Sequence, residues 1–178
     1  ETGVPMLPHA LSSHMCSLVE GHERLSQTAV LEVDPQGRVR RAEFHDGVIR
    51  VDAKLSYEQA QAIVDGDPEL RRRFAAVTPL VQRMSELAAA MRRRRYQRGA
   101  LDLDIPEPRL VLDETGNMTG IRPSVRLDSM RVVEEFMLAA NEAVAEHLHE
   151  AGVGALYRIH EQPDPVRVEE FCELAASF

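Results

Sequence analysis

The chain has 178 residues, a length that corresponds to one domain or a large piece of one. Its composition, 44% hydrophobic and 28% charged, is typical of a folded, soluble protein and excludes a disordered chain. The net charge of −8 argues against a nucleic-acid surface that covers the whole chain, although it permits a local one.

The sequence shows neither a membrane anchor nor a disulfide framework. No apolar run approaches the roughly 20 residues of a membrane-spanning helix, and no secretory signal is recognisable. The two cysteines, Cys16 and Cys172, lie far apart and outside any C-x-x-C pair. We therefore expect a cytoplasmic protein with no membrane partner. We also expect truncation at both ends, because Glu1 is not an initiator methionine and the last segment stops without a cap.

Hydrophobic periodicity and turn residues predict a mixture of strands and helices. Strands are predicted over residues 25–34, 38–51, 100–105, 109–113, 118–127 and 155–160. Helices are predicted over residues 9–13, 56–64, 68–95, 128–150 and 165–178. The strands and helices are first segregated and then alternate along the chain, an order that fits an α+β fold.

Local signals define several of these boundaries. Pro35-Gln36-Gly37 is a turn signal that joins the first two strands into a hairpin. Ser56 and Gln59 have the spacing of a capping box at a helix start. Asp67 precedes a proline and predicts the start of the next helix, which can break near Thr78-Pro79.

The helix predicted over residues 128–150 is the most informative element. Its apolar stripe consists of Val133, Phe136, Met137, Ala140, Val144 and Leu148. Glu134 and Asn141 lie at the edge of this stripe, whereas Glu135 and Glu142 are predicted to face solvent. Glu134 can be a hydrogen-bonded structural residue or can line a cleft and bind a polar ligand, and the spacing leaves both alternatives open.

The most basic segment is the arginine run 92–95. It can contact phosphates, or it can be the solvated end of a long helix, where cations interact favourably with the helix dipole. The second interpretation is the ordinary one for such a run.

Two acidic and two histidine residues raise the question of a metal site. Asp102 and Asp104 would share one face of a strand and could hold Mg²⁺, although an exposed edge strand is the ordinary interpretation. His147 and His149 would lie about 200° apart around a helix, so they cannot share a metal. We expect no metal site in this chain.

Five motifs in order resemble one family. They are Pro5-Met6-Leu7-Pro8 with Cys16-Ser17-Leu18, Phe44-His45 with Ala53-Lys54-Leu55-Ser56-Tyr57, Arg98-Gly99-Ala100-Leu101-Asp102-Leu103, Val133-Glu134-Glu135-Phe136-Met137-Leu138-Ala139-Ala140-Asn141, and Tyr157-Arg158-Ile159-His160-Glu161-Gln162-Pro163. Together they resemble the catalytic (RNB) domain of the ribonuclease II and ribonuclease R family over nearly the whole chain.

The resemblance implies a curved, mainly antiparallel sheet flanked by helices, with residues 1–178 as the middle portion of one RNB-type catalytic domain. It implies a processive 3′-to-5′ exoribonuclease that releases nucleoside monophosphates from single-stranded RNA. In this family an aspartate cluster upstream of the Pro-Met-Leu-Pro segment holds Mg²⁺, and an arginine of a downstream Ser-Pro-Ile-Arg motif steadies the phosphate.

This chain has neither an Asp-Asp pair nor a Ser-Pro-Ile-Arg motif. We therefore expect the catalytic residues and the Mg²⁺ ligands to lie outside it, and we expect the chain alone to be inactive. Its expected partners are single-stranded RNA and the remaining parts of the same catalytic domain.

The resemblance also assigns RNA-binding roles to three residues. Tyr57 matches a family tyrosine near the bound ribose, although it could simply pack. Glu134 matches a family glutamate that reads sugar hydroxyls, and a carboxylate can accept a hydrogen bond from the 2′-OH that DNA lacks. Leu103 stands where some members have a phenylalanine that clamps the bases, and a leucine can press on a base without stacking.

Two other functions remain open at this point. The chain could be a catalytically inactive RNA-binding or scaffold module that kept the fold. It could also be an unrelated metabolic α+β protein, for which Tyr57 and Glu134 would lie far apart.

Overall fold

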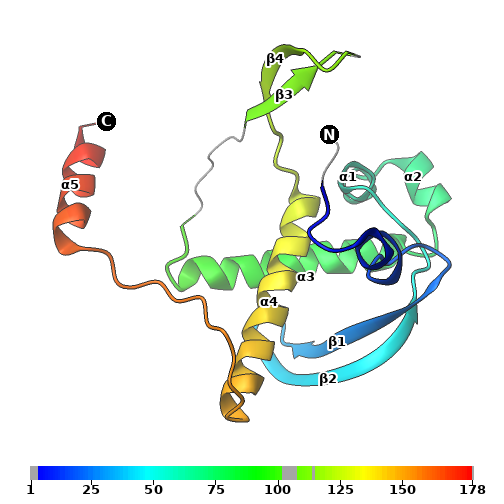
Figure 1. Ribbon diagram of the computed structural model, residues 1–178, viewed down its shortest axis with the longest axis horizontal. Coiled ribbons are helices and arrows are strands. Elements are labelled where there is room, and N and C mark those ends of the chain that lie inside the picture. Colours follow the sequence, from blue (N-terminus) through cyan, green and yellow to red (C-terminus); the bar gives the residue numbers. More distant parts are fainter. Residues whose placement is uncertain (1–3, 102–107, 114, 178) are drawn as a thin grey trace. The chain divides into compact units, whose positions relative to one another are not determined.

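The computed structural model describes residues 4–101, 108–113 and 115–177. The chain divides into two compact units, Glu1–Val144 and Ala145–Phe178. The helices are η1 (a π-helix, Ala10–Met15), α1 (Tyr57–Asp65), α2 (Pro68–Arg73), α3 (Thr78–Gln97), α4 (Asp128–Glu150) and α5 (Pro165–Ala176) (Figure 1). The strands are β1 (Glu23–Val33), β2 (Val39–Arg50), β3 (Pro108–Leu112) and β4 (Met118–Pro123). This mixture confirms the expected α+β class.

The described strands form two antiparallel hairpins. β1 pairs with β2 as a long, curved ribbon, and β3 pairs with β4 as a shorter one (Figure 1). The antiparallel pairing expected from the sequence is confirmed, and the described strands are distributed over two sheets of two strands each.

The turn between β1 and β2 is organised by one carboxylate. Asp34 Oδ1 accepts hydrogen bonds from the backbone N–H groups of Gln36 and Arg38, both at 2.9 Å. Asp34 Oδ2 accepts another from Arg40 Nε at 2.8 Å. The Arg38 N–H is the largest cause that lowers the pKa of Asp34 below its usual value of 3.8, and Arg40 adds to the effect.

We expect this turn to make the stability of the hairpin pH-dependent. A carboxyl group whose pKa is lower in the folded state stabilises that state above its unfolded pKa of 3.8. The stabilisation is lost as the pH falls through the lowered, folded value. Denaturant unfolding followed from about pH 6 to pH 2 will therefore show a flatter pH dependence for Asp34→Asn than for the wild type. Parallel curves would contradict this expectation.

The predicted helix boundaries are largely confirmed. Ser56 and Gln59 form the reciprocal capping box at α1, with bonds of 2.9 Å and 3.2 Å. Asp67 accepts the Leu70 N–H at 2.8 Å at the start of α2. The break near Thr78-Pro79 is also confirmed, because α2 and α3 are separate helices.

Two strand predictions differ from the structure. The strand predicted over residues 155–160 is wrong, since these residues form no regular structure. A strand requires a partner ladder, and β propensity by itself does not supply one. β4 ends at Pro123, which has no N–H to continue the ladder, so residues 124–127 lie outside it. Residues 102–107, most of the strand predicted over 100–105, lie outside the described part of the chain.

The buried face of α4 is not the one that its apolar stripe predicts. Val133 is 48% exposed and Met137 56% exposed, so their predicted burial is wrong. Glu135, predicted to face solvent, is only 4% exposed. The buried residues of α4 are Ser129, Glu135, Ala139 and Ala143. Arginines of α3 reach this second face, and three of its four residues are small enough to permit their close approach.

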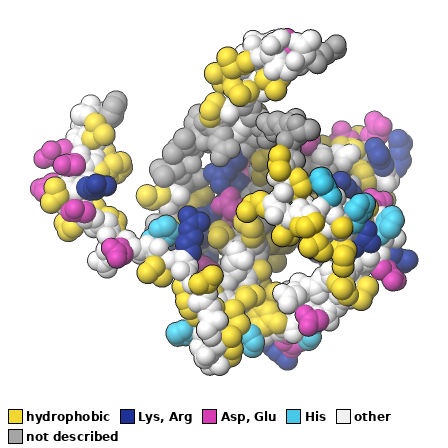
Figure 2. Space-filling view, viewed as in Figure 1, with side chains coloured by type: hydrophobic (Ala, Val, Ile, Leu, Met, Phe, Trp, Pro, Cys, Tyr) yellow, Lys and Arg dark blue, Asp and Glu magenta, His cyan; other side chains and the backbone are white. Residues whose placement is uncertain are grey.

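The β3–β4 hairpin leaves apolar side chains open to solvent, as Figure 2 shows. These side chains are Leu110, Leu112, Met118 and Ile121, which are 49% to 62% exposed. A two-stranded sheet is too small to bury a core of its own. Despite the apolar surface, no helix in the described ranges combines the length and hydrophobicity needed to cross a membrane.

Candidate nucleic-acid interface

A series of ion pairs connects α3 with α4. Three arginines spaced by three residues, two in α3 and one directly after it, meet three acidic residues of α4 that are seven residues apart. Residues spaced by three or by seven lie on one side of a helix, so each set forms a row. The pairs are Arg92–Asp128 at 3.4 Å, Arg95–Glu135 at 2.6 Å and Arg98–Glu142 at 3.3 Å.

These pairs account for most of the arginine run that the sequence displays. Arg94 Nη1 donates to the Gly37 carbonyl at 3.3 Å and so joins α3 to the β1–β2 turn. Arg92 and Arg95 contact acidic side chains of α4. The interpretation of the run as a solvated helix end is therefore incomplete for these three residues, because each is partly buried and contacts a protein acceptor.

The middle pair is the most buried of the three. Glu135 Oε1 accepts from Arg95 Nε at 3.0 Å and from Arg95 Nη2 at 2.6 Å. Hydrogen bonding to Glu135 raises the pKa of Arg95 further above its usual value. A carboxylate that is 4% exposed needs such a partner, because removal of an unpaired charge from water is costly.

Glu134 lies beside this pair, between two guanidinium groups. Its Oε1 is 3.2 Å from Arg95 Nη2, and its Oε2 is 2.7 Å from Arg126 Nη2. Its side chain remains 32% exposed. A carboxylate has about four acceptor positions, so two arginine contacts leave others for a ligand. Glu134 is thus a hydrogen-bonded structural residue that still presents acceptor positions to solvent.

Tyr57 is attached to the same helix through its main chain. It is the first residue of α1, and its carbonyl accepts a hydrogen bond of 2.7 Å from Ser129 Oγ. The residue is 44% exposed, so packing and ligand contact both stay open for its side chain. Ser129 precedes Glu134 by five residues, about 7.5 Å along the axis of α4. Convergence of the phenol and the Glu134 carboxylate on one ligand stays a prediction.

Leu103, the third RNA-binding residue expected from the sequence, lies outside the described residues. Sequence reasoning missed Arg95 and Arg126 as partners of Glu134. Arg95 lies 39 residues before Glu134 on another helix, and the spacing within either helix gave no signal for this contact. The spacing of eight residues between Arg126 and Glu134 gave none either.

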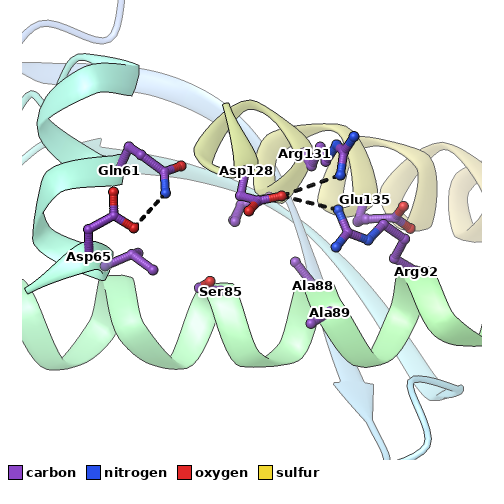
Figure 3. A pocket seen from close by; sticks show the side chains of 11 residues that line it. Gln61, Asp65, Ser85, Ala88, Ala89, Arg92, Asp128, Arg131 and Glu135 are labelled. Atoms are coloured by element: carbon purple, nitrogen blue, oxygen red, sulfur yellow. Dashed lines mark hydrogen bonds and ion pairs between the residues drawn. The ribbon is translucent and has the colours of Figure 1, made fainter. Parts of the chain in front are cut away.

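A cavity of about 170 Å³ lies between α1, α3 and α4 (Figure 3). Asp128 Oδ1 accepts from Arg92 and from Arg131, each at 3.4 Å, on one side of this cavity. Gln61 donates to Asp65 at 2.9 Å on another side. Acidic groups already face both guanidinium groups, so the charge around the cavity is largely balanced.

Residues 4–101, 108–113 and 115–177 do not fit a metal site, because they contain no cluster of potential ligands. No three His, Cys, Asp or Glu side chains in these ranges come together as metal ligands would. Asp102 and Asp104, the acidic pair considered above, lie outside these ranges.

Comparison with known proteins identifies the family. The sequence model of the RNB domain matches residues 1–177. The chain belongs to the RNB domain family. Among relatives of this RNB chain, ribonuclease R of Aquifex aeolicus is 38% identical over 169 residues, which cover 95% of the chain and 24% of that protein. Ribonuclease R of Thermotoga maritima is 39% identical over 166 residues, covering 93% of the chain and 23% of that protein.

A solved structure is similar to the RNB chain in fold as well. RNase R of Mycoplasma genitalium in complex with ribose methylated single-stranded RNA superposes with a TM-score of 0.85 and 25% identity. The match covers 98% of this chain and 27% of that one. The RNB chain therefore spans about a quarter of the length of these relatives. The resemblance drawn from the five motifs is confirmed, and the chain belongs to a ribonuclease family.

Proposed function

We propose that this RNB chain is part of a processive 3′-to-5′ exoribonuclease that hydrolyses single-stranded RNA to nucleoside monophosphates in the cytoplasm. The match of the RNB domain model over residues 1–177 carries the proposal. An RNA-bound ribonuclease R that shares the fold supports RNA as the substrate. Residues 1–178 are then the middle portion of one catalytic domain, and the remaining parts of that domain are its partners.

Within this chain, the RNA contacts are assigned to Tyr57, Glu134 and Leu103. Tyr57 is 44% exposed and the Glu134 side chain 32% exposed, so both are accessible to a ribose. A carboxylate accepts a hydrogen bond from a 2′-hydroxyl, and DNA supplies no such donor. In this assignment the chain binds and orients the substrate.

The cofactor of the whole protein is proposed to be Mg²⁺, held by residues outside this chain. Bound there, Mg²⁺ would supply the activation of a water and the stabilisation of the leaving oxygen. The described residues do not fit a metal site, so no chemical step is assigned to them.

A direct assay tests the proposed function. The full-length protein and the 178-residue chain are each incubated with labelled single-stranded RNA and Mg²⁺. We expect mononucleotide release by the full-length protein and none above a mock preparation by the chain alone. Release by the chain alone would show that the active site has been misplaced. RNA binding without release by the full-length protein would identify an inactive RNA-binding module instead.

In the full-length protein, Glu134→Ala is expected to reduce the preference for RNA over DNA. Loss of a hydrogen bond to a charged group costs about 1.5–3 kcal/mol, a roughly ten- to hundredfold change in discrimination. The measurement is the RNA-to-DNA ratio of kcat/KM beside a melting curve. Glu142→Ala is the control, because Glu142 lies on the same helix as Glu134 and forms an exposed ion pair with Arg98. A lowered melting temperature with an unchanged ratio would leave Glu134 with a structural role only.

A further inference from the structure

The Glu134 carboxylate is held at both of its oxygens, by arginines from two different segments. Arg95 on α3 contacts Oε1, and Arg126, in the segment before α4, contacts Oε2. The terminal torsion of a glutamate is broad, so a carboxylate held at one oxygen can still turn. Contacts at both oxygens remove that freedom and fix the directions in which the remaining acceptor positions point.

The two arginines differ in how they are anchored. Arg95 is fixed from the interior, because its Nε and Nη2 also donate to the buried Glu135. Arg126 is the more exposed of the two, with a side chain that is 39% exposed. Glu134 therefore has one neighbour that also holds the buried Glu135, and a second neighbour whose substitution leaves the Arg95–Glu135 pair in place.

We propose that Arg95 and Arg126 are positioning residues for ribose recognition, and that they act by orienting the Glu134 carboxylate. The inference rests on the proposed function, in which Glu134 accepts a hydrogen bond from the 2′-hydroxyl. Hydrogen bonds weaken steeply when misaligned, so the orientation of the acceptor decides how much RNA gains over DNA. An acceptor that is already ordered also loses little conformational freedom when the ligand binds.

Arg126 is the residue to test, since loss of Arg95 would also leave Glu135 buried without its partner. In the full-length protein we expect Arg126→Met to lower the RNA-to-DNA ratio of kcat/KM about tenfold, and Arg126→Lys to restore part of it. Arg98→Met is the matched control, because it breaks an exposed Arg–Glu pair between α3 and α4. Its ratio is expected to stay at the wild-type value.

A double-mutant cycle with Glu134→Gln separates positioning from other roles of Arg126. If Arg126 acts through Glu134, the ratio of the double variant equals that of Glu134→Gln alone. Additive effects would overturn the inference. A fall in activity on RNA and DNA alike, with the ratio preserved, would also overturn it and would indicate a phosphate contact or a structural role.

Failure of the proposed function gives a different result. A wild-type protein that releases no mononucleotides contradicts the function before any variant is compared. If the wild type is active and Glu134→Gln keeps the wild-type ratio, the positioning inference is overturned while the exoribonuclease activity stands.

Discussion

Glu135→Ala is expected to lower the free energy of unfolding by about 3 kcal/mol and the melting temperature by roughly 6–12 °C. The substitution leaves the Arg95 guanidinium without the carboxylate that receives two of its hydrogen bonds. Loss of one partner from a buried ion pair is strongly destabilising because the other charge stays behind. The value lies at the low end of the usual range because the Arg95 side chain is 24% exposed and retains Glu134.

The third pair of the same series is the control for this experiment. Glu142→Ala removes the partner of Arg98, but the two side chains are 65% and 51% exposed. Exposed ion pairs contribute about 0–1 kcal/mol, so its melting temperature is expected to change little. Thermal unfolding of both variants is the measurement. Equal losses would show that burial of Glu135 does not matter for stability.

Gly37→Ala is expected to lower the free energy of unfolding by about 2–5 kcal/mol, as the sum of a conformational and a steric cost. Gly37 has a φ of +77°, a left-handed conformation that is unfavourable for residues with a Cβ. A Cβ at this position would also lie 2.8 Å from the Met91 backbone N and Cα. These atoms belong to α3, so the turn between β1 and β2 would have to move away from the helix.

Gly21→Ala separates the two costs. Gly21 has a nearly identical φ of +75°, but nothing lies within 4 Å of the place that a Cβ would take there. The conformational cost alone, about 1–2 kcal/mol, is expected for this variant. Denaturant unfolding of both variants gives the difference, which measures the close approach of the turn to α3. An equal loss in the two variants would mean that the turn does not need this contact.

The substitutions Glu135→Ala and Gly37→Ala act on the two contacts of α3, with α4 and with the β1–β2 turn. Gly37 brings the hairpin turn against α3, where its carbonyl accepts from Arg94. The neighbouring Arg95 reaches α4 and contacts Glu134 and Glu135. A hairpin, a central helix and the helix that carries Glu134 are thereby linked through consecutive arginines. Loss of either contact is therefore expected to disturb the position of the Glu134 side chain.

Part of the candidate site was predictable from the sequence. Tyr57 and Glu134 were found because they stand within motifs that resemble the RNB family. Their surroundings were not found, since the apolar stripe of α4 assigns Glu135 to solvent. That assignment assumes that the most hydrophobic face of a helix is always the buried one. A carboxylate can take a buried place when an arginine from another helix neutralises it, and no feature of one helix reveals such a partner.

The sequence by itself determined the local structure and the family. The capping box at Ser56, the Asp67 cap, the turn ending at Gly37 and the antiparallel hairpin all follow from interactions between residues close in the chain. Only the tertiary structure decided which face of α4 is buried and which partners hold Glu134. These depend on contacts across about 40 residues, such as Arg95 with Glu135, whose geometry the spacing within either helix does not contain. The strand predicted over residues 155–160 differs for the same reason, because a strand forms only where a second strand pairs with it.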